Sequence, residues 1–260
     1  STLRHTLFPY TTLFRSYWYK GSHLIRSNPR PSFWRAPTDN DFGNNMQRNA
    51  NIWRMAGSHK TVKEVNIEKG DDFIRITAAY RLNDINSDYQ LTHTVTPDGK
   101  IRVEARFTAG KENLPEMPRM GMTMIVPGQF DQFSYYGRGP WENYADRNYS
   151  SHLGIYTSKV SEQYEPYIRP QENGNKTGVR WLALTNEQGI GLRVEGLQPL
   201  SVSALHNPVE DFDPGLSKKQ RHSSDIHPRE EIFLDIDLKQ RGLRGDNSWG
   251  ARPHNPYRLT

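Results

Sequence analysis

In the stretch YQLTHTVTPDGKIRVEARF, residues 89–107, mainly apolar residues alternate with polar ones on both sides of a central turn. Alternation with a period of two is the pattern of a β-strand with one buried face. The turn is supplied by Asp98-Gly99, because glycine reaches the positive φ angle that a tight hairpin needs. The sequence therefore predicts an antiparallel hairpin. Its inward positions are Tyr89, Leu91, His93 and Val95, then Ile101, Val103, Ala105 and Phe107.

Other stretches show the same period. Residues 179–194 predict a second hairpin around the turn at 186–189, and residues 120–126 and 232–238 each predict a strand. The positions expected on one face are Val179, Trp181 and Ala183, then Ile190, Leu192 and Val194; Met120, Met122, Met124 and Val126; and Ile232, Leu234, Ile236 and Leu238, with acids on the opposite face. Methionine can line a permissive sugar site, but we expect this methionine stripe to fill core.

Only one segment predicts a helix. Met46, Ala50 and Trp53 lie at i, i+4 and i+7 after Asn44, and Gly57 is a candidate C-cap. Many strands joined by Gly, Pro and Asn turns predict an all-β fold, a large two-sheet antiparallel β-sandwich. We see no linker and no internal repeat, so we expect a single domain over residues 17–260.

The composition excludes several classes. The chain of 260 residues has no cysteine, which excludes disulfides and thiolate metal sites. A net charge of +5 and a pI near 9.3 suggest nucleic-acid binding, but acids interleave with the Lys and Arg residues and no RNA-binding motif is present. No stretch approaches the ~18 apolar residues of a membrane span. A mixed-charge, solvated surface is favoured.

The first residues do not resemble a natural protein segment. Residues 6–16, TLFPYTTLFRS, resemble the conceptual translation of a sequencing adapter. We therefore expect residues 1–16 to be a non-native tail that packs poorly, and we exclude them from fold reasoning. The alternative is an ordinary N-terminal β-strand.

Three motifs combine turn residues, charges and tryptophan: FWRAPTDNDFG at 33–43, YGRGPWENYADR at 136–147 and GDNSWG at 245–250. With YEPYIRPQENG at 164–174, they resemble the C-terminal small-chain domain (domain 5) of bacterial β-galactosidases of glycoside hydrolase family 2. The resemblance covers about residues 20–252 and implies a sandwich of the galactose-mutarotase type. The family's domain continues past the last motif, so we expect a chain truncated at both ends, with an unpaired sheet edge.

The resemblance implies hydrolysis of terminal β-D-galactosides such as lactose, with retention at the anomeric carbon. In the family, both catalytic glutamates and the Mg²⁺ and Na⁺ (in some cases Ca²⁺) sites lie in a TIM barrel. This chain has no eight-fold βα pattern, so we assign it no catalytic carboxylate and no metal ligand. The implied partners are the galactoside, the catalytic barrel and further subunits of a homo-oligomer, not nucleic acid or membrane. We expect the fragment alone to be inactive; cytoplasm and periplasm stay open.

The resemblance implies that Trp249 stacks on the sugar beyond the scissile bond. An indole offers a flat apolar surface to the C–H face of a pyranose, and a turn tip is where a scaffold presents a binding residue. Asp246 and Asn247 can bond the local backbone and fix the turn, so we group them with Trp249 as substrate-binding candidates. The alternative is a tryptophan buried under its own loop.

Two groups of charged residues predict structural or interface roles. Arg35, Asp39 and Asp41 are expected to form a cluster that fixes the first motif; if it faces water, its ion pairs contribute about 0–1 kcal/mol. The DND segment also resembles a calcium loop, but its twelfth position, where an EF-hand needs a bidentate acid, is Ala50. A cation held by the two aspartates with other partners is left open.

The second group is Glu142, Asp146 and Arg147, from which we expect a buried or interface polar network. The GRGP segment just before it is no phosphate loop, since no Lys-Ser/Thr pair follows it. We expect the polar end of residues 164–174 to border the sugar cleft.

Two other functions stay open. A free-standing mutarotase needs an acid and a base, for which Glu195 and His206 are the one pair we can nominate. A carbohydrate-binding module predicts lactose binding by the isolated chain. Zinc is not indicated, because His206, His222, His227 and His254 lack zinc-site spacing.

Overall fold

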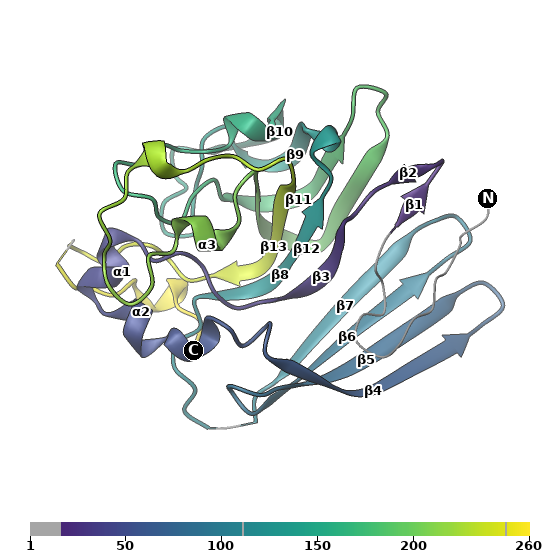
Figure 1. Ribbon diagram of the computed structural model, residues 1–260, viewed down its shortest axis with the longest axis horizontal. Coiled ribbons are helices and arrows are strands. Elements are labelled where there is room, and N and C mark those ends of the chain that lie inside the picture. The colour runs from purple at the N-terminus through teal and green to yellow at the C-terminus, as the bar shows by residue number, and fades with distance from the viewer. Residues whose placement is uncertain (1–16, 111, 248) are drawn as a thin grey trace.

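The computed structural model describes residues 17–110, 112–247 and 249–260. The adapter-like residues 1–16 lie outside the described residues. Strand makes up 44% of the structure and helix 12%, which confirms the predicted all-β class. The strands form three antiparallel sheets in a sandwich-like arrangement (Figure 1).

The largest sheet has seven strands in the order β10-β9-β11-β12-β13-β8-β3. Neighbours in it are antiparallel throughout, and β11 with β12 forms the predicted second hairpin. Its strands are β3 (Ser27–Ser32), β8 (Arg119–Val126), β9 (Gln132–Gly139), β10 (His152–Lys159), β11 (Lys176–Thr185), β12 (Gly191–Leu205) and β13 (Ile232–Gln240).

The second sheet consists of four strands in chain order. The predicted hairpin of residues 89–107 is present, with Tyr89 opposite Phe107 and Val95 opposite Ile101. Gly99 has a φ angle of 83° in its turn, so the glycine is where the backbone requires one. The four strands are β4 (Lys60–Lys69), β5 (Ile74–Leu82), β6 (Ser87–Val95) and β7 (Ile101–Thr108), and the small third sheet pairs β1 (Trp18–Tyr19) with β2 (Ser22–His23).

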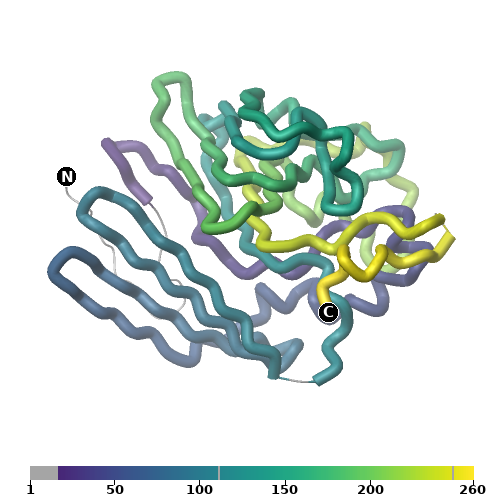
Figure 2. Tube along the Cα trace, turned by 180° about the vertical axis from the view of Figure 1, so that it is seen from behind, coloured from purple at the N-terminus to yellow at the C-terminus, as the bar shows by residue number. Residues whose placement is uncertain are grey.

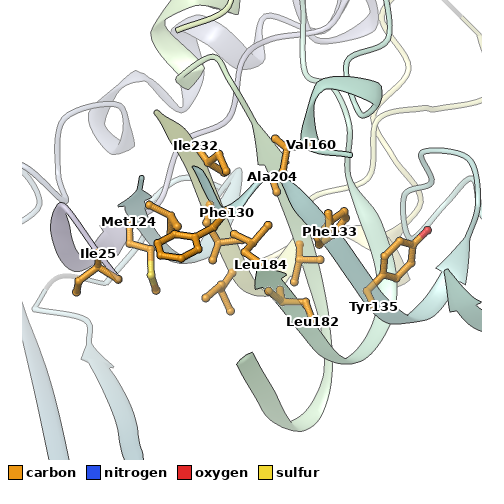
Figure 3. Packing of buried hydrophobic residues seen from close by; sticks show 14 of the residues in the cluster. Ile25, Met124, Phe130, Phe133, Tyr135, Val160, Leu182, Leu184, Ala204 and Ile232 are labelled. Carbon is orange, nitrogen blue, oxygen red and sulfur yellow. The ribbon is translucent and has the colours of Figure 1, made fainter. Parts of the chain in front are cut away.

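The main hydrophobic core lies on one face of the seven-stranded sheet. Phe133 of β9, Leu184 of β11 and Ile232 of β13 are almost completely buried in it, and Figure 3 shows them with their neighbours. Phe130 and Val160 come from short 3₁₀ helices, so connections between strands also contribute to this core. Each fully buried aliphatic or aromatic side chain contributes roughly 1.5–3 kcal/mol relative to exposure.

A register shift corrects the predicted face of β11. The shift lies between Val179 and Trp181, and it brings Leu182 and Leu184 into the core after Val179. Trp181 and the alanine at 183 are only partly buried. Such an irregularity in strand pairing can exchange the two faces of a strand, and nothing in the alternation marks where it occurs.

A second shift corrects the end of β13. Ile232, Leu234 and Ile236 are buried as predicted, but the register changes between Asp237 and Lys239. Leu238 is consequently exposed and Asp237 is fully buried. The acids of this strand therefore do not all face solvent.

A second core joins the four-stranded sheet to the segment after β3. Met46, Ala50 and Trp53 are buried there as predicted, but they do not share one helix. Helix α2 (Met46–Asn49) ends before Ala50, and the 3₁₀ helix η1 (Asn51–Trp53) follows. Gly57 is not a left-handed C-cap; a Cβ there would lie 2.1 Å from the carbonyl oxygen of Pro31.

The methionine stripe of β8 fills core, as expected. Met120 and Met122 pack against the second core, whereas Met124 and Val126 lie in the main core. This strand therefore links the two hydrophobic clusters.

The remaining helices are short. Helix α1 (Asp39–Gly43) and the C-terminal segment lie at the end of the molecule away from the long hairpins of the four-stranded sheet, as the opposite views of Figures 1 and 2 show. No helix in the described part of the chain is long and apolar enough to cross a membrane. The others are α3 (Val209–Phe212), η2 (Gly128–Phe130), η3 (Val160–Glu162), η4 (Ser223–Asp225) and η5 (Asn255–Tyr257).

Candidate functional site

Trp249 projects from the C-terminal segment and is 89% exposed. Asn247 shapes its turn, because its Oδ1 accepts the backbone N–H of Trp249 at 2.9 Å and that of Ala251 at 3.3 Å. This is the local bonding expected of an Asx residue. The alternative of a tryptophan buried under its own loop is wrong.

Asp246 makes a different contact from the one expected. Its Oδ1 lies 2.7 Å from Nε2 of His254, so the carboxylate bonds a side chain rather than the local backbone. Both partners are well exposed, at 80% for Asp246 and 62% for His254. The pair spans the turn that carries Trp249.

The segment from 242 to 257, here called the Trp249 loop, is closed at its base. The backbone N–H of Gly242 donates to the carbonyl of Tyr257 at 2.8 Å. Asp146 holds the same base from the β9–β10 connection, since its Oδ2 accepts the backbone N–H of Arg244 at 2.8 Å. Close approach is possible because residue 242 is glycine; a Cβ would lie 2.5 Å from Asp146 Oδ2.

The loop also rests on the first motif. A Cβ built on Gly250 would lie 3.1 Å from the carbonyl oxygen of Gly43, the last residue of α1. Asn44 Nδ2 donates to the carbonyl of Ala251 at 3.4 Å, and Asn40 Nδ2 donates to Leu243 at 3.4 Å. Motifs about 200 residues apart in sequence are thus in contact.

Asp41 is the centre of a buried charge cluster behind the loop. It is a capping residue of α1, paired with Thr38, and it forms ion pairs with Arg35 at 2.5 Å and Arg241 at 2.8 Å. Arg35 and Asp41 are both 0% exposed, so this part of the cluster does not face water. Burial tends to lower the pKa of Arg35, but Asp41 outweighs it and the net shift is upward. Arg35 also donates to the carbonyl of Gly242, at 3.3 Å.

Asp39 does not join this cluster, contrary to the prediction. It is 53% exposed and contacts Arg169 and Lys218, each at 2.8 Å. Burial tends to raise the pKa of Asp39, but the hydrogen bonds from Lys218 and Arg169 lower it overall. The same two basic side chains lie over the ring of Phe42.

The two aspartates do not converge on a cation site. Each carboxylate already accepts hydrogen bonds from basic side chains of its own neighbourhood, Arg35 and Arg241 for Asp41 and Arg169 for Asp39. Within the described ranges, no group of three or more His, Asp or Glu residues is placed to hold a metal.

The predicted network of the second motif is present in part. Glu142 bonds to Arg147 and to the hydroxyl of Tyr167, and its Oε2 accepts the backbone N–H of Gly174 at 2.8 Å. Burial, with Glu142 beside it, raises the pKa of Tyr167 to about 12. Asp146 is not a member, because it faces the Trp249 loop.

A second buried ionic cluster was missed by the sequence analysis. Arg119 lies 2.7 Å from Asp235, 3.1 Å from Asp237 and 3.2 Å from Glu172. Burial raises the pKa of Asp237 well above its ordinary value, and burial also raises that of Glu172. The alternation of β13 placed Asp235 and Asp237 on its outer face; only the tertiary structure brings them, with Glu172, to Arg119.

Two cavities accompany these clusters. One of about 20 Å³ borders Arg119, Glu172 and Asp235, which is room for a single water molecule. The larger, of about 240 Å³, lies between α2 and the C-terminal residues. Its lining is Asn44, Met46, Asn49, Ala50, Pro115, Glu116, Arg241, Arg252, Arg258 and Thr260. Trp249 itself does not line it.

The nominated mutarotase pair is not brought together. Glu195 is paired with Arg193 near the start of β12, whereas His206 follows the end of that strand and contacts Asp131 at 3.5 Å. At ~3.3 Å per residue, the two positions lie on the order of 30 Å apart along the strand. They cannot act on one sugar ring.

Comparison with known proteins places the chain in a family. The sequence profile described as "Beta galactosidase small chain" matches residues 6–260. The β-galactosidase of Priestia megaterium (strain DSM 319 / IMG 1521) is 37% identical over 246 residues, which cover 95% of this chain and 23% of that protein. Those of Lactobacillus delbrueckii subsp. bulgaricus and Streptococcus thermophilus are 32% and 31% identical, over 93% of this chain and 23% of theirs. The chain thus spans about a quarter of the length of these relatives, and it belongs to the β-galactosidase small-chain family.

Proposed function

We propose that this chain is the small-chain part of a longer β-galactosidase acting on terminal β-D-galactosides such as lactose. Its contribution is the wall that faces the leaving-group sugar, with Trp249 as the platform. Family membership and the one-quarter coverage of β-galactosidase relatives support this proposal.

In this proposal the catalytic carboxyl groups lie in the rest of that polypeptide. A retaining glycosidase needs two carboxyl groups roughly 5–5.5 Å apart, one as nucleophile and one as acid and base. We place them, with the Mg²⁺ and Na⁺ sites of the parent enzyme, in its TIM barrel. The acids at this site already have other partners: Asp41 pairs with Arg35 and Arg241, Asp146 holds the loop, and Asp246 pairs with His254. The fragment alone would then be inactive.

The observation that carries the proposal is the 89% exposure of Trp249 on a turn whose backbone is fixed by Asn247. A turn tip is where a scaffold presents a binding residue, and the flat face of an exposed indole suits the C–H face of a pyranose. An indole stacked on a pyranose contributes on the order of 1 kcal/mol, by extension from aromatic pairs. Asp246 and Asn247 contribute to the same site by fixing the turn that carries the indole.

Replacing Trp249 by alanine in the complete β-galactosidase tests the role. We expect the KM for lactose to rise about fivefold, because about 1 kcal/mol of stacking is lost. The inhibition constant of free galactose should stay the same, since galactose alone does not reach the platform. Trp18→Ala is the matched control: that tryptophan is also exposed, at 57%, but lies on β1 of the small third sheet. An unchanged KM for the Trp249 variant would contradict the platform.

Calorimetry distinguishes the proposed function from that of a carbohydrate-binding module. The isolated chain should show no measurable heat with lactose, because half of the sugar site is missing. Measurable binding without the barrel would favour the module instead. The genomic reading frame upstream of residue 17 gives an independent test, since it should encode a barrel with two catalytic glutamates.

A further inference from the structure

The Trp249 loop is held at two levels by side chains that do not touch the indole. At its base, Asp146 accepts the backbone N–H of Arg244 at 2.8 Å. Nearer the tip, His254 lies 2.7 Å from Asp246, three residues before Trp249. Among the described residues of the loop, the one regular element is the 3₁₀ helix η5, so the side-chain contacts provide much of its support.

Asp146 is placed for this from a different part of the fold. It lies between β9 and β10, in a connection anchored by the fully buried Asn143. The amide of Asn143 donates to the carbonyls of Arg138 and Trp141, and its oxygen accepts the backbone N–H of Thr177 at 2.9 Å. The hydrogen bonds of Asn143 therefore hold the connection that places the Asp146 carboxylate against the loop.

A fixed loop matters for a stacking platform. A flexible tip would spend part of its time in arrangements that cannot bind, and the apparent affinity falls by that fraction. Ordering the loop on binding would also consume binding free energy. Contacts that order it beforehand therefore strengthen recognition without touching the sugar.

We propose that Asp146 and His254 are positioning residues for Trp249. Asp146 fixes the base of the loop, and His254 fixes the turn through Asp246. The inference rests on the proposed function, because it assigns these residues to the leaving-group side of the same site. Neither residue contacts the galactose ring in this assignment.

A double-mutant cycle in the complete β-galactosidase tests the proposal. We expect Asp146→Ala and His254→Ala each to raise the KM for lactose about threefold, less than Trp249→Ala, because the loop still visits its bound arrangement. The inhibition constant of galactose should not change. In a Trp249→Ala background, neither substitution should raise KM further, since residues that act through Trp249 have nothing left to position. A rise of equal size in that background would overturn the proposal.

Conservative variants and a control complete the design. Asp146→Asn keeps an oxygen that accepts the Arg244 N–H, and His254→Gln keeps a donor to Asp246, so both should restore most of the affinity. Glu68→Ala is the control, an exposed acid on β4 of the four-stranded sheet whose partner is Arg75. If Asp146→Ala does not fold, Asp146→Asn and the exposed His254→Ala decide the outcome.

A readout independent of activity separates this proposal from the proposed function. Trypsin can cleave after Arg244, which is exposed and whose backbone is held by Asp146. Cleavage there should become about threefold faster in Asp146→Ala, because local opening controls proteolysis. Faster cleavage with an unchanged lactose KM in Trp249→Ala would mean that the loop is positioned but is not the platform. Unchanged cleavage and unchanged KM in both positioning variants, with a raised KM in Trp249→Ala, would overturn the positioning role alone.

Discussion

Gly121 of β8 and Asp237 of β13 lie directly opposite each other in the seven-stranded sheet. A Cβ on residue 121 would come within 1.9 Å of Asp237 Oδ1 and 2.7 Å of the carbonyl oxygen of Ile236. The missing side chain gives the carboxyl group of Asp237 room beside Arg119. The buried ionic cluster of Arg119 therefore depends on a glycine in the neighbouring strand.

Gly121→Ala tests this dependence. The added methyl group meets both a side chain and backbone, so we expect the free energy of unfolding to fall by about 3 kcal/mol. Gly99→Ala is the comparison, because nothing lies within 4 Å of its Cβ position and only its positive φ is strained. That variant should lose roughly 1 kcal/mol. Equal losses in urea denaturation would contradict the packing argument.

The two aspartates of the first motif should differ strongly in their effect on stability. Asp41→Asn leaves the buried Arg35 without its carboxylate partner and leaves Arg241 with Glu116 alone, and breaking such a buried pair costs about 3–5 kcal/mol. Asp39→Asn removes only exposed contacts to Arg169 and Lys218 and should cost less than about 1 kcal/mol. Thermal unfolding of both variants measures the difference. Similar melting temperatures would show that the Asp41 cluster is not a stabilising centre.

Asp237 should make stability fall as pH rises. Burial raises its pKa in the folded state, so above its ordinary value of 3.8 the folded protein holds a proton that the unfolded chain has released. When the folded state binds more protons, the free energy of unfolding decreases with pH. Asp237→Asn should flatten the stability curve from about pH 4 upward and be more stable than the wild type at pH 8. Parallel curves for the two proteins would contradict a raised pKa.

Lys176 should act in the opposite direction. It is buried at the start of β11, and burial lowers its pKa from an ordinary 10.5 to about 8. Between these values the unfolded chain binds the extra proton, so stability rises as pH increases from about 8 to about 10.5. Lys176→Met should abolish this rise and be more stable than the wild type at pH 7. The wild-type and variant unfolding curves, compared at pH 7 and pH 10, measure the effect.

Many strands of the fold were predictable because apolar and polar residues alternate along each of them. The hairpin of residues 89–107 appears with its turn at Gly99, and the stripe of β8 fills core. The errors occur where the register of a strand pair shifts. The shifts after Val179 and after Asp237 exchange inside and outside, and no property of the single strand marks them.

The candidate site divides in the same way. Trp249 and Asn247 were identified from the turn chemistry and the family resemblance, and the indole is exposed on an Asx turn. Arg35 and Asp41 were expected together and are paired. Two further contacts join segments that are remote in sequence. Asp41 pairs with Arg241, and Asp146 accepts the backbone N–H of Arg244.

The sequence by itself determined the β class, the hairpins and which tryptophan stands at a turn tip. These features depend on the alternation of apolar and polar side chains along a strand. They also depend on the backbone angles that turn residues, near each other in the chain, can adopt. Only the tertiary structure decided that Asp237 is buried, that Asp39 and Asp41 have separate partners, and that Asp146 supports the Trp249 loop. Those outcomes depend on strand register and on contacts between distant segments, because a charge is retained inside the protein only where the fold brings it a partner.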